Sequence, residues 1–275
     1  MNFRAKKSLG QHFLTSKLVL AQIISAAALK PGERVLEIGP GTGILTEALL
    51  AAGAKLTAIE KDDRAIGFLQ RKFALEIAEG RLNLIHGDVL ESDTSLLASC
   101  PTPYALVANI PYYITGAILE KFLEYGPQPD RMILLVQKEV AERIVAHDGK
   151  ESVLSLSVKA FGRPRIISIV PGGAFNPPPS VDSAIMAIDD INDRAFREHS
   201  RGRQPLDIKK FFMIVRAGFA HKRKFLLRNL EAVAPLRQLE SIWHELEMDS
   251  KMRAEEVPVK EWLRIAEKIE LGSER

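Results

Sequence analysis

The chain has 275 residues, of which 46% are hydrophobic and 27% charged, and its formal net charge is +3. This length and composition are typical of a soluble globular protein with one large and one small domain, or two of medium size. They exclude a membrane-spanning helix, since no apolar run approaches the roughly 20 residues needed to cross a bilayer.

A single cysteine and scattered histidines narrow the class of protein further. Cys100 is the only cysteine, so no disulfide can form within the chain, and we expect a cytoplasmic location. The basic N-terminus has no apolar segment after it, so we expect no secretory signal. None of the six histidines stands with Cys, Asp or Glu at metal-ligand spacing, so the sequence predicts no metal site.

Strand-like and helix-like segments alternate over residues 1–190, which is the pattern of a parallel sheet covered by helices. The expected strands are 35–39, 55–60, 82–87, 104–108, 132–137, 165–170 and 181–188. The expected helices are 43–50, 64–78, 114–123, 138–146 and 152–161. Residues 191–206 are polar with little periodicity, so we expect a linker there. In residues 207–275 apolar side chains recur at helical spacing, which predicts a small helical domain.

Three consecutive strand ends carry residues that suit a nucleoside. Residues 35–43 read Val-Leu-Glu-Ile-Gly-Pro-Gly-Thr-Gly, in which Gly39 and Gly41 allow a tight turn and a close backbone approach. The spacing differs from the dinucleotide fingerprint, and a purely structural turn is the alternative. Glu60 ends the second strand, where an acid accepts from ribose hydroxyls, and Asp88 ends the third, where it can accept from an adenine amine. Each acid alone is more typical of a loop or helix cap, but together they predict a pocket for a nucleoside without phosphates.

A fourth strand end carries Asn109-Ile110-Pro111-Tyr112, directly after the apolar run 104–108. The Asn side-chain oxygen and a backbone carbonyl fixed by the proline can accept both N–H bonds of an exocyclic amine. The tyrosine ring can stack on the face of a base. The alternative is a strand that ends in an ordinary proline turn. The neighbouring nucleoside motifs favour the base-binding interpretation.

Charge is distributed unevenly along the chain. Residues 194–228 contain eleven Lys or Arg and two acids, a net charge of +9, so the rest of the chain carries −6 against the total of +3. This asymmetry indicates a polyanion partner for one region. A solvated helix face is the alternative.

These motifs resemble those of class I methyltransferases that bind S-adenosylmethionine, and more narrowly those of the KsgA/RsmA family of rRNA adenine N6-dimethyltransferases. The match extends over nearly the whole chain through residues 10–14 (Gly-Gln-His-Phe-Leu), 135–140, 175–183 and 253–256 (Arg-Ala-Glu-Glu). The resemblance implies an α/β fold with a Rossmann-like, mostly parallel seven-stranded sheet and a small all-α C-terminal domain. It implies S-adenosyl-L-methionine as cofactor and N6,N6-dimethylation of two adjacent adenines in the 3′-terminal hairpin loop of small-subunit (16S) rRNA. The implied partner is that rRNA or a 30S assembly intermediate, bound by a monomer.

Roles are carried over from the family by position. The implied cofactor-binding residues are His12, Leu14, Gly39, Gly41, Glu60, Asp88 and Asn109. The implied catalytic residues are Asn109 and Pro111, which hold the target amine, and Tyr112 and Phe175, which sandwich the target base. The implied RNA-binding residues lie on a helical stretch and are Lys222, Arg223, Lys224 and Arg228.

Some positions depart from the family, and other functions remain open. His12 and Tyr113 both stand where the family usually has Asn, and Gly116 stands where a small polar residue or proline is commoner. One alternative is a large-subunit rRNA adenine N6-methyltransferase of the antibiotic-resistance type, which shares Asn-Ile-Pro-Tyr; the stretch 252–256 argues for the small-subunit group. A non-catalytic ribosome-assembly factor on the same fold is a second alternative.

Overall fold

The structure is a computed structural model that describes residues 10–91, 103–198 and 205–270. Cys100 lies outside the described residues. By their contacts the described residues form two compact units. The first contains the described part of Met1–Ala141 together with Arg163–Ile191, and the second contains Glu142–Gly162 and the described part of Asn192–Arg275.

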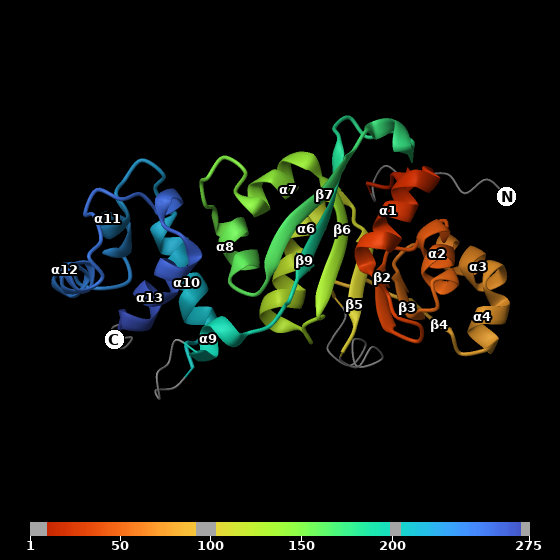
Figure 1. Ribbon diagram of the computed structural model, residues 1–275, viewed down its shortest axis with the longest axis horizontal. Coiled ribbons are helices and arrows are strands. Elements are labelled where there is room, and N and C mark those ends of the chain that lie inside the picture. The colour runs from red at the N-terminus through yellow and green to blue at the C-terminus, as the bar shows by residue number, and fades with distance from the viewer. Residues whose placement is uncertain (1–9, 92–102, 199–204, 271–275) are drawn as a thin grey trace. The chain divides into compact units, whose positions relative to one another are not determined.

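The first unit is built on a sheet to which the described residues contribute seven strands, in the order β4-β3-β2-β5-β6-β9-β7 (Figure 1). These strands are β2 (Arg34–Ile38), β3 (Lys55–Glu60), β4 (Leu82–His86), β5 (Ala105–Asn109), β6 (Arg131–Gln137), β7 (Arg163–Val170) and β9 (Ser183–Asp189). Strand β9 runs antiparallel to both of its neighbours, and all the other pairs are parallel. The predicted mostly parallel, seven-stranded sheet is therefore confirmed.

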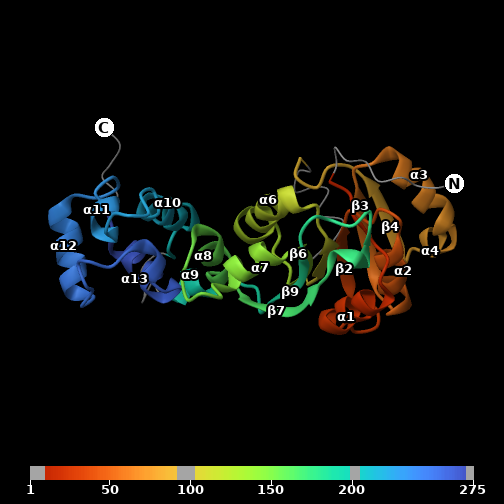
Figure 2. The same cartoon turned by 90° about the horizontal axis from the view of Figure 1, so that it is seen from above.

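Helices cover both faces of this sheet. The helical segments of the first unit are α1 (Lys17–Ala27), α2 (Ile44–Ala51), α3 (Asp63–Lys72), α4 (Ala74–Ala78), η2 (Tyr112–Ile114), α6 (Thr115–Glu120), the π-helical turn η3 (Lys121–Tyr125) and η4 (Gly172–Ala174). Helix α1 lies on one face and α6 on the other (Figure 2). The central strand β5 is apolar because it is buried on both sides, with Ala105 to Ala108 at most 1% exposed.

A small second sheet ties the segment before α1 to the segment before β9. Strand β1 (Phe13–Leu14) pairs antiparallel with β8 (Phe175–Asn176). The Thr15 N–H and hydroxyl both donate to the carbonyl of Ala174, at 2.8 and 3.0 Å. This pairing, which the sequence does not predict, brings residues 10–14 to the carboxyl edge of the main sheet.

The second unit is helical. Its elements are α8 (Val153–Lys159), α9 (Arg194–Glu198), α10 (Ile208–Gly218), α11 (Leu226–Leu230), α12 (Leu236–Glu245), η5 (Ala254–Glu256) and α13 (Val259–Lys268), and α7 (Lys138–Val145) crosses the boundary between the units. The Phe161 ring is tilted against that of Phe196, with centroids 5.0 Å apart, and stacks on that of Phe212, with centroids 6.1 Å apart. These rings explain why residues 142–162 group with the C-terminal helices, and why α9 forms within the expected linker.

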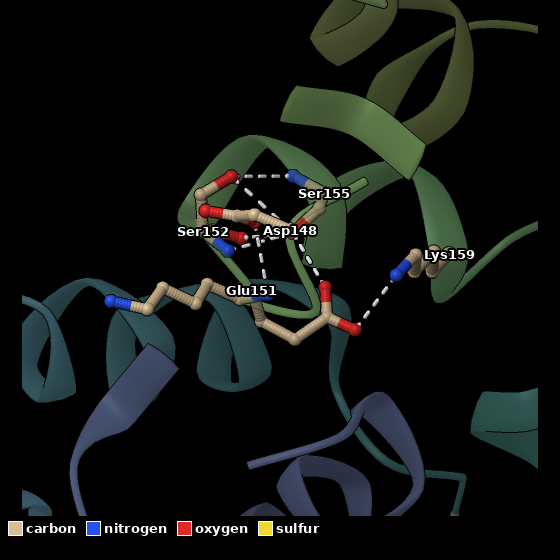
Figure 3. Close-up of polar contacts among 6 residues, drawn as sticks. Asp148, Glu151, Ser152, Ser155 and Lys159 are labelled. Atoms are coloured by element: carbon tan, nitrogen blue, oxygen red, sulfur yellow. Dashed lines mark hydrogen bonds and ion pairs between the residues drawn. The ribbon is translucent and has the colours of Figure 1, made fainter. Parts of the chain in front are cut away.

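A network of hydrogen bonds fixes the start of α8 within this unit (Figure 3). Ser152 caps the helix by accepting from the Ser155 N–H at 3.1 Å, and the Ser155 hydroxyl donates to Glu151 at 2.6 Å. The other Glu151 oxygen pairs with Lys159 at 2.8 Å. Since Ser155 is fully buried and each group has a partner, the network stabilises the helix rather than forming a reactive centre.

Candidate active site

A cavity of about 280 Å³ lies at the carboxyl ends of the parallel strands β2, β3, β4 and β5. Ligands of open α/β sheets bind at this edge. The lining includes most of the predicted cofactor and catalytic residues, namely His12, Gly39, Gly41, Glu60, Asp88, Asn109, Pro111 and Tyr112. The structure thus brings together groups that are nearly one hundred residues apart in the sequence.

The glycine turn between β2 and α2 forms the floor of the cavity. Gly41 has φ of +55°, and a Cβ atom added to it would lie 3.0 Å from the Phe13 ring. A side chain at this position would therefore meet both backbone strain and a steric clash. The Gly39 N–H donates to the carbonyl of Ile59 at 2.9 Å, which holds the turn against β3.

Glu60 is a buried acceptor in the cavity. It is only 5% exposed, and its two carboxylate oxygens accept the N–H groups of Gly41 and Asp62 at 2.9 and 2.8 Å. Burial raises the pKa of Glu60, and these two backbone donors oppose that shift. Each oxygen keeps a second lone pair, so the carboxylate can still accept from two hydroxyl groups of a ligand.

Glu37 lies beneath the same turn and should make folding stability depend on pH. It is 1% exposed, and Thr46 donates to one of its oxygens at 2.8 Å. Burial raises the pKa of Glu37 from 4.5 to about 8, and the nearby charge of Glu60 adds to the shift. An unfolded carboxyl ionises near its ordinary pKa, so the folded protein loses stability as pH rises towards about 8.

We expect Glu37→Gln to remove this pH dependence, because the amide is uncharged at every pH. The difference in melting temperature between the variant and the parent should shift in favour of the variant between about pH 5 and pH 8. Thermal melting of both proteins across this range measures the shift. Parallel melting curves at all pH values would contradict the burial of an ionisable Glu37.

The carboxylate of Asp88 already accepts two hydrogen bonds from the protein. It receives the Lys61 ammonium at 2.5 Å and the N–H of Leu90 at 2.9 Å. Burial raises the pKa of Asp88, but the Lys61 hydrogen bond and the Leu90 N–H outweigh it, so the net shift is downward. Asp88 is therefore a carboxylate held in place at the rim of the cavity.

Asn109 is oriented by the segment that precedes β1. Its Nδ2 donates to the backbone carbonyl of His12 at 3.1 Å. This bond uses a donor of the amide and turns the amide so that Oδ1 remains the acceptor. The predicted role of Asn109 requires this orientation, since an amine can be held only by an acceptor.

The Tyr112 side chain contacts Ser183 through its hydroxyl and lies beside the His12 ring. Its hydroxyl shares a hydrogen bond of 2.6 Å with Ser183, and burial raises the pKa of Tyr112, so the phenol stays neutral. Its ring lies nearly parallel to that of His12, with an interplanar angle of 19° and centroids 6.0 Å apart. The His12 ring is held in turn by a bond of 2.8 Å between Nδ1 and the carbonyl of Pro177.

The predicted positions of Phe175 and Leu14 in the site are not observed. Phe175 and Leu14 pair across β8 and β1, are 4% and 3% exposed, and belong to the hydrophobic core rather than to the cavity lining. In this structure the aromatic ring opposite Tyr112 is that of His12. Phe175 lies in the hydrophobic core on β8, so its sandwich with Tyr112 around a target base stays a prediction.

Other residues of the cavity were not predicted as site residues. Gln11 donates to Asp62 at 3.2 Å, and Phe13, Lys61 and Tyr113 line the cavity. Lys61 follows Glu60 directly, and Tyr113 follows Tyr112, so adjacency to a predicted residue is the signal that could have found them. Phe13 and Gln11 depend on the unpredicted β1–β8 pairing.

Comparison with known proteins identifies the family. Residues 2–271 match the family model described as ribosomal RNA adenine dimethylase. The chain belongs to this family. One relative, the ribosomal RNA small subunit methyltransferase A of Dehalococcoides mccartyi, is 42% identical over 95% of this chain and 87% of its own length. The protein of the same name from Thermosynechococcus vestitus is 39% identical over 96% of both chains.

Two solved structures support this family membership. A dimethyladenosine transferase from Plasmodium falciparum has a TM-score of 0.76 and 28% identity, over 92% of this chain and 96% of that one. The 23S rRNA methyltransferase ErmE has a TM-score of 0.69 and 27% identity, over 93% of this chain and 98% of that one. The fold is thus that of the class I methyltransferases, with the helical C-terminal region that the sequence predicts.

Three of the four predicted RNA-binding residues lie in a turn of the second unit, which corrects their predicted helical placement. Lys222, Arg223 and Lys224 lie between α10 and α11, and Arg228 lies within α11. Together with Phe225 and Glu231, three of them line an open surface depression. Arg228 pairs with Glu231 at 2.6 Å, so its charge is partly neutralised locally.

Among the described residues, no group of three or more His, Cys, Asp or Glu side chains is placed to hold a metal ion. None of the described helices is long and apolar enough to cross a membrane.

Proposed function

We propose that this protein transfers methyl groups from S-adenosyl-L-methionine to the N6 amines of two adjacent adenines in the 3′-terminal hairpin loop of small-subunit rRNA. The observation that carries the proposal is the hydrogen bond from Asn109 to the carbonyl of His12, which leaves Oδ1 as an acceptor in the cavity. The relatives at 37–43% identity, all named as small-subunit rRNA methyltransferases, support the choice of substrate.

The cavity fits a nucleoside-containing cofactor. Glu60 can accept from both ribose hydroxyls, since each oxygen retains a lone pair beside its backbone donor. Gly39 and Gly41 present backbone without side chains, and Asp88 supplies a carboxylate at the rim. When bound, the cofactor supplies an electrophilic methyl group on a sulfonium. The residues named here would hold its adenosine portion.

The amine of adenine is a poor nucleophile, because its lone pair is delocalised into the ring. Asn109 Oδ1 and a backbone carbonyl accept its two N–H bonds, which favours a localised lone pair and stabilises the positive charge that develops on nitrogen. The carbonyl of Pro111 already accepts the N–H of Ile114 at 3.1 Å, so Ile110 is the better second acceptor. Tyr112 stacks on the base, and the cationic product loses its proton to water.

Methylation of purified RNA separates this function from the large-subunit alternative. The enzyme is incubated with labelled methyl donor and with small-subunit or large-subunit rRNA, each as naked RNA and as ribosomal particles, prepared from cells that lack these modifications. Label should enter only the small-subunit RNA. The rates of labelling of naked small-subunit RNA and of small-subunit particles show which of the two the enzyme prefers. Label only in large-subunit RNA would overturn the assignment.

We propose residues 207–275 as the RNA-binding domain, with Lys222, Arg223, Lys224 and Arg228 as contacts to phosphates. We expect the double variant Arg223→Gln/Arg228→Gln to weaken binding of small-subunit rRNA and to flatten its salt dependence by up to about one unit per lost contact. Filter binding across a salt series measures both, and cofactor affinity should not change.

Arg264→Gln is the matched control for this prediction. Arg264 pairs with Glu261 at 2.8 Å just as Arg228 pairs with Glu231 at 2.6 Å, and in both pairs the partners are three residues apart in the chain. Its loss should leave RNA binding unchanged. If the double variant binds rRNA as tightly as the parent at every salt concentration, Arg223 and Arg228 lie on a solvated surface that does not contact RNA.

A further inference from the structure

Tyr113 is an aromatic side chain at the mouth of the cavity that the proposed reaction does not use. It lines the cavity next to Tyr112, yet it is 68% exposed, more than any other aromatic residue of the described chain. Its neighbour Tyr112 is half-buried and hydrogen-bonded to Ser183. An exposed aromatic ring that lines a binding cavity is available to stack on a base.

Gly10 leaves room for the Tyr113 ring. A Cβ atom added to Gly10 would lie 3.2 Å from Cε1 and 3.3 Å from Cδ1 of Tyr113, and 3.8 Å from Cβ of Pro111. Gly10 also has φ of +59°, a backbone conformation that favours glycine. A side chain at position 10 would therefore crowd the ring, whereas glycine leaves the ring 68% exposed and open to a ligand.

Tyr113 can be reached from solvent even when a cofactor occupies the cavity. Glu60, which would hold the cofactor, is 5% exposed, whereas Tyr113 is 68% exposed. A partner that comes from solvent can therefore cover the ring. In the proposed reaction that partner is RNA, whose bases stack readily on exposed aromatic rings.

Two adjacent adenines create a need for such a ring. When one adenine enters the cavity to reach Asn109, it leaves the stack, and its neighbour loses a stacking partner at the mouth. Resting on the proposed function, we propose that Tyr113 stacks on the second adenine of the pair and so positions the first for methyl transfer. Tyr113 is then a substrate-positioning residue, at a place where the resembled family usually has Asn.

A double-mutant cycle between protein and RNA tests this contact. The binding probes are a synthetic hairpin with both adenines and two hairpins in which one or the other adenine is replaced by an abasic nucleotide, measured with S-adenosylhomocysteine present. The protein variants are Tyr113→Asn, Tyr113→Phe and, as a matched control, Tyr125→Asn. Tyr125 is a second exposed tyrosine, 57% exposed, that does not line the cavity.

Tyr113→Asn should weaken binding of the intact hairpin about 5- to 150-fold, the range for loss of one stacked base. On at least one abasic hairpin, Tyr113→Asn should bind as tightly as the parent protein does, because the base that Tyr113 would contact is already missing. Tyr113→Phe should bind like the parent, since stacking needs the ring and not the hydroxyl, and so should Tyr125→Asn.

Additive losses on both abasic hairpins would overturn the proposal, as would a Tyr113→Asn variant that loses cofactor affinity while it binds RNA normally. The proposed function is tested separately by methylation of small-subunit rRNA, as naked RNA and as ribosomal particles, with the parent protein. A parent enzyme that leaves both adenines unmethylated fails at that function, whatever the cycle shows.

Discussion

Asn109→Ala is expected to slow methyl transfer about a hundred- to a thousand-fold, the typical effect of removing one aligned group that stabilises a developing charge. The variant loses the Oδ1 acceptor and also the 3.1 Å hydrogen bond to the carbonyl of His12. The acceptor acts on the substrate amine and not on the cofactor's ribose, so cofactor affinity should change only a few-fold. Single-turnover kinetics beside a calorimetric titration with S-adenosylmethionine measure the two effects.

Asn192→Ala is the control for a general effect of losing an asparagine, since Asn192 does not line the cavity. It should methylate at the parental rate. An Asn109→Ala variant with a normal rate would remove Asn109 from the chemistry, and equal losses in rate and cofactor affinity would make it a cofactor ligand instead.

Glu60→Ala is expected to weaken cofactor binding about 5- to 150-fold, which corresponds to the roughly 1–3 kcal/mol lost when buried polar groups lose their acceptor. The change removes the acceptor for the ribose hydroxyls. It also leaves the N–H groups of Gly41 and Asp62 without the carboxylate that they bind at 2.9 and 2.8 Å. Isothermal calorimetry measures the affinity, and thermal melting at the same pH shows whether the variant is folded.

Glu47→Ala is the matched control, because Glu47 lies in the first turn of α2 after the same glycine turn but has a side chain that is 67% exposed. Its cofactor affinity should equal that of the parent. Glu60→Gln adds a second test, since it retains one acceptor oxygen and should bind more tightly than Glu60→Ala. Unchanged affinity in folded Glu60→Ala protein would exclude Glu60 from the site.

The strand ends of the sheet could be predicted from the sequence, and the contacts between distant segments could not. Gly39 follows strand β2, and Glu60 and Asn109 end strands β3 and β5, so the parallel fold places all three at one edge of the sheet. The pairing of β1 with β8 joins segments about 160 residues apart and leaves only two residues in each strand. Such a short pairing has no periodicity to detect, which is why the burial of Phe175 and the contacts of His12 were missed.

The helical unit shows the same limit. The apolar spacing after Ile208 predicts α10 correctly, with Phe211 and Phe212 buried. The grouping of residues 142–162 with these helices depends on contacts of Phe161 with rings far along the chain, which no local pattern indicates. Apolar residues at helical spacing resume at Leu226 only a few positions after α10 ends at Gly218, so the short turn that holds residues 222–224 was not predicted.

Mass spectrometry of nucleosides from small-subunit RNA tests the central claim most directly. A strain that lacks this protein is compared with the same strain carrying either the parent or the Asn109→Ala variant. We predict N6,N6-dimethyladenosine at the two adjacent adenines of the 3′-terminal hairpin with the parent, and its loss in the deletion strain and with the variant. Unmodified adenines in small-subunit RNA from the strain that carries the parent, or dimethyladenosine confined to large-subunit RNA, would contradict the account.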